Sequence, residues 1–148
     1  MSLLGRFRGD RADGVGLYVD GPNVLREEFD VDLDDLRAIA TEYGRIGAAR
    51  LYLDEHATPG LIQAGEARGF AVVTTSGDVD VKLAVDATRA ASEARIETLV
   101  IASRDTDFKP ALEVAADRGC RTVAIAPGEH GRSDALSNTA HESHSLEG

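Results

Sequence analysis

The sequence is poor in cysteine and in aromatic side chains. Its 148 residues include one Cys and no Trp, and aromatic residues make up 5%. A single cysteine cannot form an internal disulfide, and Cys120 lies in the apolar run CRTVAIA, where a small buried thiol is expected rather than a nucleophile or a metal ligand. The scarcity of aromatic side chains argues against recognition of nucleic acid by base stacking.

Long hydrophobic runs are also absent. No apolar run approaches the roughly 20 residues that a membrane-spanning helix needs. The N-terminal stretch MSLLGRFRGDRADG becomes charged too early to serve as the core of a signal peptide. Together with the single cysteine, these features lead us to expect a protein of the reducing cytoplasm.

Lysine is scarce as well, because Lys82 and Lys109 are the only two, and the net charge is −10. Such acidity argues against capture of nucleic acid by a basic patch or stripe. Basic residues that are nearly all Arg, with Asp more frequent than Glu, indicate a halophilic protein. In concentrated salt, repulsion is screened beyond a few ångströms, so local contacts with a polyanion stay available.

What the sequence does contain is a regular alternation of two patterns. A chain of this length, with 43% hydrophobic residues, is expected to form one domain. Nearly continuous apolar runs, typical of strands covered on both faces, alternate with segments of helical periodicity. This alternation predicts an α/β fold, in which a mainly parallel sheet lies between two helical layers in a three-layer sandwich. The five predicted strands are 15–19, 48–53, 70–74, 97–102 and 121–126.

The predicted domain covers residues 15–126, and different structure is expected on either side of it. Residues 1–14 are predicted to form a flexible arm. Residues 127–148 are predicted to form a polar tail with at most one short helix, which Leu136 and Ala140 would pin. The histidines of this tail match no common spacing of metal ligands.

Acidic residues follow several of the predicted strands. Asp20 follows the first strand and is joined to Gly-Pro-Asn, Asp78 and Asp80 follow the third, and Asp105 and Asp107 follow the fourth. Ligands of open parallel sheets bind at the carboxyl ends of the strands, so these carboxylates are expected to converge there. Crowded carboxylates stay ionised together only when a cation compensates them, and their oxygens favour Mg²⁺ or Mn²⁺. Such a site suits hydrolysis of a phosphodiester, with Asp20 and Asp105 as the favoured functional acids.

Several of these acids also have a purely structural interpretation. Asp78 and Asp107 precede predicted helices and would then serve as N-caps. Asp86 would pair with Lys82, one helical turn earlier. The two acids after the second strand, at 54–55, are expected to be solvated loop charges.

Three sequence blocks resemble one known family. YVDGPNVL, SGDVDVKLAVDA and ASRDTDFKPALEVAADRGCRTVAIA occur in this order, each at its predicted position on a strand or helix. Over residues 15–126 the chain resembles the NYN domain family, a branch of the PIN-like nuclease superfamily, and above all its archaeal members. The resemblance implies a Rossmann-like three-layer fold and a metal-dependent ribonuclease that holds Mg²⁺ or Mn²⁺ with a cluster of Asp residues.

The resemblance also implies roles for residues of this chain. Asp20 matches a central metal ligand, and Asn23 matches a residue that orients substrate or a metal-bound water. The implied metal ligands are Asp20, Asp80, Asp105 and Asp107, with Asp78 and Asp86 as secondary candidates.

The final block carries the expected substrate-binding residues, which are Ser103, Arg104 and Lys109. Many relatives have Gly where this chain has Arg104, which would either contact a substrate phosphate or crowd the entrance. His141 stands where relatives often carry an acid in a closing helix, so that helix is not expected to supply a carboxylate.

The leading hypothesis is therefore a Mg²⁺- or Mn²⁺-dependent ribonuclease that hydrolyses RNA phosphodiester bonds. The alternative is an RNA-binding or regulatory domain that keeps the fold with little or no catalysis. A homodimer and an unknown protein partner are both left open, and no membrane partner is expected. A haloacid-dehalogenase-type phosphatase fits less well, because it needs a second Asp where this chain has Pro22.

Overall fold

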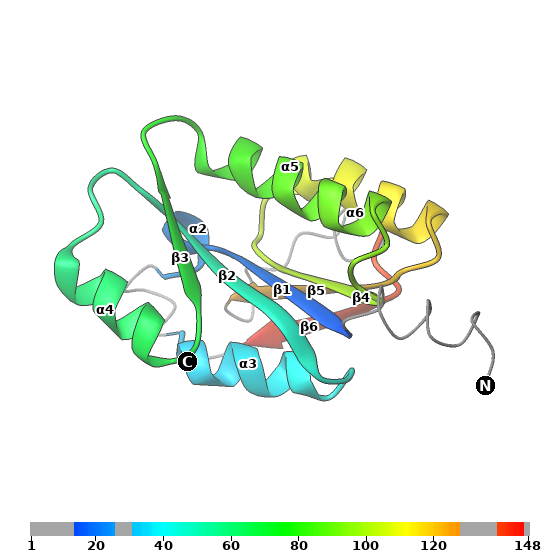
Figure 1. Ribbon diagram of the computed structural model, residues 1–148, viewed down its shortest axis with the longest axis horizontal. Coiled ribbons are helices and arrows are strands. Elements are labelled where there is room, and N and C mark those ends of the chain that lie inside the picture. Colours follow the sequence, from blue (N-terminus) through cyan, green and yellow to red (C-terminus); the bar gives the residue numbers. More distant parts are fainter. Residues whose placement is uncertain (1–13, 26–30, 128–138, 147–148) are drawn as a thin grey trace.

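The computed structural model describes residues 14–25, 31–127 and 139–146, which form a three-layer α/β sandwich. A six-stranded sheet lies in the middle, with α5 and α6 on one face and α3 and α4 on the other (Figure 1). None of the helices within these ranges is long and apolar enough to cross a bilayer. The elements are β1 (Val15–Asp20), α2 (Gly21–Val24), α3 (Leu33–Thr41), β2 (Ile46–Asp54), α4 (Pro59–Ala67), β3 (Ala71–Thr75), α5 (Val79–Ser92), β4 (Thr98–Ala102), the 3₁₀ turn η2 (Thr106–Phe108), α6 (Lys109–Asp117), β5 (Arg121–Pro127) and β6 (Glu142–Leu146).

The sheet has a strand order that creates a crevice at one point of its edge. Its order is β3-β2-β1-β4-β5-β6, and all the pairings are parallel. The chain winds outward from β1 in one direction and then from β4 in the other. The connections therefore leave β1 and β4 toward opposite faces of the sheet, which opens a crevice outside their carboxyl ends.

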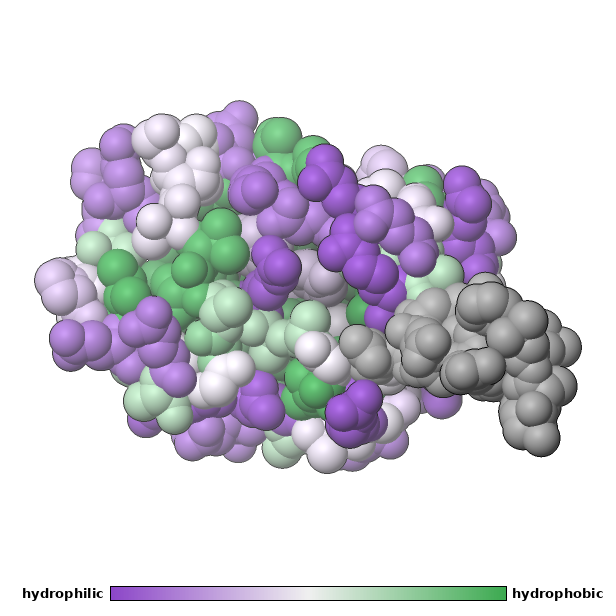
Figure 2. Space-filling model, in the orientation of Figure 1, coloured by the Kyte–Doolittle hydropathy of each residue, from purple (hydrophilic) through white to green (hydrophobic). Residues whose placement is uncertain are grey.

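Two hydrophobic cores, one on each face, hold the layers together. All residues of β1 and β4 are buried, as expected for central strands that helices cover on both faces. Toward α5 and α6 the core includes Leu83 and Leu112, and toward α3 and α4 it includes Leu36 and Leu51. Helix α5 turns several buried Ala side chains toward the sheet, so the helix backbone lies close to the sheet. At the sheet edge, Figure 2 shows hydrophobic side chains over β3 and the adjoining part of α4, whereas the surface over α5 is mostly hydrophilic.

The turn after β1 depends on a residue without a side chain. A Cβ atom added at Gly21 would lie 2.5 Å from the backbone oxygen of Tyr52, far inside van der Waals contact. Pro22 follows in the first turn of α2, where its fixed φ suits a helix start and its missing N–H costs nothing. The sequence Asp20-Gly21-Pro22 therefore places the Asp20 carboxylate at the strand end while the backbone turns tightly against β2.

The number of strands predicted from the sequence was wrong by one. The five predicted strands are present, and a sixth, β6, pairs parallel to β5 within the segment predicted to be a polar tail. The sequence of β6, ESHSL, has no apolar alternation, because an edge strand needs one backbone neighbour rather than two buried faces. Most of the short helix predicted around Leu136 and Ala140, and all of His130, lie outside the described residues.

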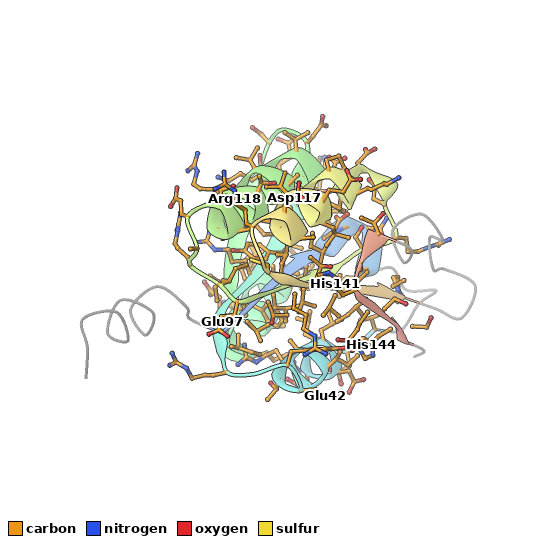
Figure 3. The ribbon with its side chains drawn as sticks, turned by 90° about the vertical axis from the view of Figure 1, so that its right-hand side faces the viewer. Glu42, Glu97, Asp117, Arg118, His141 and His144 are labelled. Carbon is orange, nitrogen blue, oxygen red and sulfur yellow. The ribbon has the colours of Figure 1, made fainter. Side chains whose placement is uncertain are left out.

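Polar side chains fasten β6 to the rest of the sandwich. Arg121 at the start of β5 forms an ion pair with Glu142, and its Nε donates to Glu142 Oε2 at 2.6 Å. The Tyr43 hydroxyl donates to Glu142 Oε1 at 3.1 Å and lies 2.6 Å from His144 Nε2. Thr122 is hydrogen bonded to His141, with its backbone N–H 2.9 Å from Nδ1. Figure 3 views this side of the molecule, with His141 and His144 labelled.

Candidate metal centre

The predicted acidic side chains meet in the crevice between β1 and β4. Asp20 ends β1, and Ser103 to Asp107 leave the end of β4, its direct neighbour in the sheet. Asp80 comes from the first turn of α5, the helix that lies beside α6 on one face of the sheet. Residues far apart in the chain are thus brought to one place by the parallel register and by the crossover that leads into α5.

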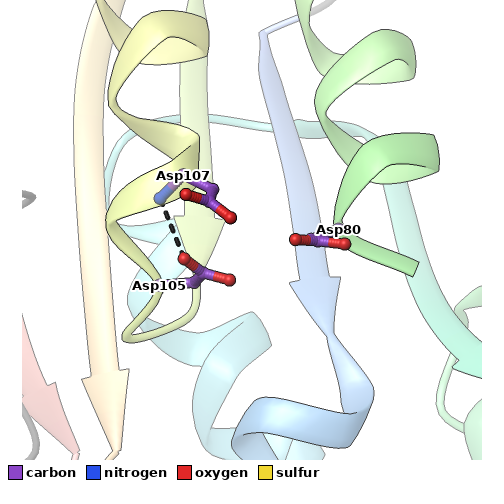
Figure 4. Close-up of side chains that lie close together, drawn as sticks. All are labelled: Asp80, Asp105 and Asp107. Carbon is purple, nitrogen blue, oxygen red and sulfur yellow. Dashed lines mark hydrogen bonds between the residues drawn. The ribbon is translucent and has the colours of Figure 1, made fainter. Parts of the chain in front are cut away.

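Three carboxylates form the compact part of this group. Asp80, Asp105 and Asp107 each offer one oxygen, and these oxygens all lie within 4.8 Å of one another. Figure 4 shows Asp80 pointing from α5 toward the two acids that precede α6. The Asp107 backbone N–H donates to Asp105 Oδ1 at 2.9 Å, so Asp105 stabilises the 3₁₀ turn and the two side chains keep a fixed relation.

Asp20 lies beneath this cluster and is connected to it through Ser103. The Ser103 hydroxyl donates to Asp20 Oδ2 at 3.0 Å and accepts from the Asp105 backbone N–H at 3.0 Å. Asp20 is 4% exposed and Ser103 is fully buried. A buried hydroxyl with both its donor and acceptor used within the protein is placed to orient Asp20. The contact of Ser103 with substrate stays a prediction, and its burial favours a role in positioning Asp20 instead.

Asn23 joins the two loops that border the crevice. Its side-chain oxygen accepts from the Arg104 backbone N–H at 2.8 Å. Asn23 therefore ties the turn after β1 to the loop after β4. This contact gives it a positioning role that its place in the sequence alone did not reveal.

The pKa values of Asp20 and Asp107 show that the negative charge in this crevice is poorly compensated. Burial raises the pKa of Asp20 to about 6, against the opposing hydrogen bonds from Ser103 and the Asn23 backbone, and the charges of Asp105 and Asp80 raise it further. The nearby Asp105 charge is also the main cause of a raised pKa at Asp107. Like charges that raise one another's pKa values would be relieved by a cation.

A cavity of about 350 Å³ opens beside these acids. Asp20, Asn23, Asp80 and Asp105 all line it. Asp78 lines it as well, and although it stands at the N-cap of α5, its side chain makes no capping hydrogen bond. The N-cap position predicted for Asp78 is confirmed, and its side chain does not supply the capping hydrogen bond.

Asp86 is held in an ion-pair network apart from the three clustered carboxylates. Its carboxylate lies 3.2 Å from Lys82 Nζ and 3.8 Å from an Arg50 guanidinium nitrogen, and it accepts from the Tyr52 hydroxyl at 2.8 Å. The pairing with Lys82 that the sequence suggested is confirmed. These partners compensate the Asp86 charge, and its role as a secondary metal ligand stays a prediction.

One residue of the crevice was assigned to solvent by the sequence interpretation. Asp54, at the end of β2, is half-buried and lines the same cavity as Asp20 and Asp80. Its position two residues beyond Tyr52, which pairs in register with Asp20, was the available signal. Lys109, by contrast, lies exposed at the start of α6, and its contact with substrate stays a prediction.

Comparison with known proteins identifies the family. A family model described as the NYN domain matches residues 14–147, so this chain belongs to the NYN domain family and has its PIN-like nuclease fold. An uncharacterised protein of the archaeon Methanocaldococcus jannaschii is 43% identical over 126 residues, which make up 85% of this chain and 52% of that protein. The chain thus spans about half the length of this curated relative.

A solved structure supports the fold independently. The crystal structure of a protein of unknown function from Vibrio parahaemolyticus has a TM-score of 0.76 at 19% sequence identity, covering 93% of this chain and 95% of the other. At this identity the likeness establishes a shared fold. The resemblance drawn from the three sequence blocks is confirmed as to family and fold class.

The residues at the crevice fit a hard divalent cation. Every candidate ligand atom in the three-carboxylate cluster is an oxygen, and Mg²⁺ and Mn²⁺ prefer oxygen ligands. The cluster opens beside a cavity rather than closing on itself, which leaves room for a phosphate group. The raised pKa of Asp107, caused chiefly by the Asp105 charge, is a second sign that the arrangement lacks positive charge.

Proposed function

We propose that this protein is a ribonuclease that hydrolyses RNA phosphodiester bonds with Mg²⁺ or Mn²⁺. The observation that carries the proposal is the approach of the Asp80, Asp105 and Asp107 oxygens within 4.8 Å of one another at the crevice of a PIN-like fold. Such crowding has no evident structural benefit, since the charges repel one another. It is the arrangement expected when a cation is to be bound.

The residues of the chain would divide the work as follows. Asp80, Asp105 and Asp107 would hold the ion, together with the buried Asp20. When bound, the ion would activate water for attack on phosphorus and stabilise negative charge on the phosphate oxygens. Ser103 would hold Asp20 in one orientation, and Asn23 would keep the two loops together.

Positive charge for the substrate would come from the α6 side of the crevice. Arg104 follows Ser103 directly, and Lys109 starts α6 one turn after Asp105. Both can neutralise phosphates that flank the hydrolysed bond. Because the chain as a whole is acidic, we expect these local contacts rather than a broad basic surface to bind RNA.

A cleavage assay with a matched pair of variants tests the proposal. Asp80→Asn should abolish cleavage of single-stranded RNA in Mn²⁺, because it removes a ligand charge while keeping the side-chain shape. Asp117→Asn, the same change at an exposed position at the end of α6, should cleave like the wild type. Wild-type protein that is inert on all RNAs with either metal, or full activity of Asp80→Asn, would refute catalysis at this site.

One observation favours the alternative of a non-catalytic RNA-binding or regulatory domain. The Asn23 oxygen, expected to orient substrate, is instead bonded to the Arg104 backbone. Calorimetry with Mn²⁺ alongside the cleavage assay separates the two functions. Metal uptake with RNA binding but without turnover would support the alternative.

A further inference from the structure

A second cavity adjoins the candidate metal centre. It has a volume of about 200 Å³ and lies beyond the end of β2, between α2 and the start of α4. Pro22 and Asp54 line both this cavity and the one that contains Asp20, Asp80 and Asp105. The two hollows therefore share a wall, and a molecule bound at the carboxylates can extend into the second cavity.

The walls of this cavity are apolar, unlike those of the metal centre. Pro22, Leu25, Ala57 and Leu61 line it, and the last three are half-buried side chains that pack against the core below α3 and α4. The volume is smaller than the 300 Å³ or more typical of sites for drug-sized ligands. A space of this size and lining suits one flat ring system with apolar faces.

One edge of the cavity carries charge. Asp54 Oδ1 accepts the His56 backbone N–H at 2.9 Å, which fixes the orientation of the carboxylate. A carboxylate accepts up to about four hydrogen bonds, so it has capacity for a ligand's N–H groups. It also repels phosphate, so this cavity suits a base better than the phosphate backbone. His56 also lines the cavity.

We propose that this cavity is a nucleobase subsite of the ribonuclease, and that Asp54 makes it selective for guanine. The proposal rests on the proposed function, because it places the base of a nucleotide whose phosphate lies at the carboxylates. Guanine presents two adjacent N–H donors, N1–H and the 2-amino group, to a carboxylate. Uracil presents carbonyl oxygens on both sides of its single N–H, and a carboxylate repels them.

Binding of mononucleotides to the full chain tests the subsite without requiring turnover. Guanosine 5′-monophosphate and inosine 5′-monophosphate form a matched pair of probes, since they differ only in the 2-amino group. Amide signals of Leu25, Ala57 and Leu61 in NMR titrations should shift with the guanine nucleotide at about 5-fold or more lower concentration than with the inosine or uridine nucleotide. Equal affinities for the three nucleotides would overturn the selectivity.

Two variants and a control test the two parts of the proposal. Asp54→Asn should bring the affinities for the guanine and inosine nucleotides close together, because the neutral amide no longer offers two acceptor oxygens. Ala57→Phe should fill the cavity and abolish the shifts at Leu25 and Leu61. Ala67→Phe adds the same bulk at the exposed far end of α4 and should leave binding unchanged. Unaltered binding in Ala57→Phe would show that the base lies elsewhere.

The outcomes separate the subsite from the catalytic proposal. If the protein cleaves no RNA but the guanine nucleotide shifts the cavity signals, the subsite is supported and ribonuclease activity is refuted. If wild type and Ala57→Phe cleave RNA alike, after the same bases, the subsite is refuted and the activity is supported. Loss of all cleavage in Asp54→Asn with guanine selectivity of binding intact would show that Asp54 serves the metal instead.

Discussion

The charged side chains at the two ends of the sheet are arranged in opposite ways, with like charges together at one end and opposite charges paired at the other. At the carboxyl ends of β1 and β4, Asp80, Asp105 and Asp107 gather with oxygens within 4.8 Å of one another. At the amino end of β5, Arg121 pairs with Glu142, and its guanidinium lies 4.9 Å from the centre of the Tyr43 ring. One end collects charges of the same sign, and the other pairs opposite charges.

The pKa values of acidic groups show the consequence of this difference. The pKa of Asp107 is raised chiefly by the neighbouring Asp105 charge. Partial burial alone would raise the pKa of Glu142, but hydrogen bonds from Arg121 and Tyr43 lower it below its usual value. Compensated charge at the amino end fastens β6 to the sandwich. Uncompensated charge at the carboxyl end needs another explanation, and a bound cation supplies one.

The largest expected difference between the two ends is the response to metal. A ligand that binds only the folded state at 100 times its dissociation constant stabilises a protein by about 2.7 kcal/mol. We expect Mn²⁺ to raise the thermal midpoint of the wild type and of Glu142→Gln alike, and to leave Asp105→Asn unmoved. Differential scanning calorimetry with and without Mn²⁺ measures this. A comparable rise in Asp105→Asn would place the ion elsewhere.

The next effect concerns Asp20 in the absence of metal. Its folded pKa of about 6 lies above the unfolded value, so ionised Asp20 destabilises the folded protein at pH 7. Asp20→Asn should therefore be more stable than the wild type by about 3 kcal/mol at pH 7. The advantage should shrink as the pH falls through 6 and disappear near pH 4. Urea unfolding in EDTA at both pH values checks this, and a constant difference would contradict it.

A smaller effect is expected at Ser103, which holds Asp20 without meeting the ion. Ser103→Ala should weaken Mn²⁺ binding by about 10-fold, since positioning residues of metal sites typically contribute that much. Ser145→Ala, an exposed serine on β6, should bind Mn²⁺ like the wild type. Isothermal titration measures both. Wild-type affinity in Ser103→Ala would mean that Asp20 needs no support.

The smallest effect is expected from the paired charges of the amino end. Glu142→Gln should lower the free energy of unfolding by less than about 1 kcal/mol, because the pair is largely exposed and screened by salt. The loss should diminish further in concentrated salt. Urea unfolding at low and high ionic strength measures it. A loss of several kcal/mol would mean that β6 is essential to the fold rather than an added edge.

Much of the centre could be anticipated from the chain alone. One apolar run ends directly in Asp20, and another is followed, three residues beyond Ala102, by Asp105; both patterns indicate acids at the carboxyl ends of parallel strands. That β4 lies directly beside β1, and so brings these acids together, depends on the strand order. Adaptation to salt and a cytoplasmic location stay predictions.

The misjudged residues share a cause. In the sequence Asp54 resembles an ordinary loop residue and Ser103 resembles a residue that meets substrate. Their roles depend on neighbours that are remote in the chain, such as Asp20, 83 positions from Ser103. Strand β6 was missed because its polar sequence follows no period-two pattern and its partners, Tyr43 and Arg121, are remote. Hydrophobic periodicity depends on neighbouring positions in the chain and does not indicate contacts between remote residues.

By itself the sequence determined the types of element, the fold class and the acidic strand ends, because hydrophobic periodicity and turn residues act over a few neighbouring positions. Only the tertiary structure decided which acids share a cluster, which pair with Lys or Arg, and which hollow lies beside them. Those outcomes depend on strand order and on distances between remote side chains, and electrostatic energy is governed by such distances rather than by separation along the chain.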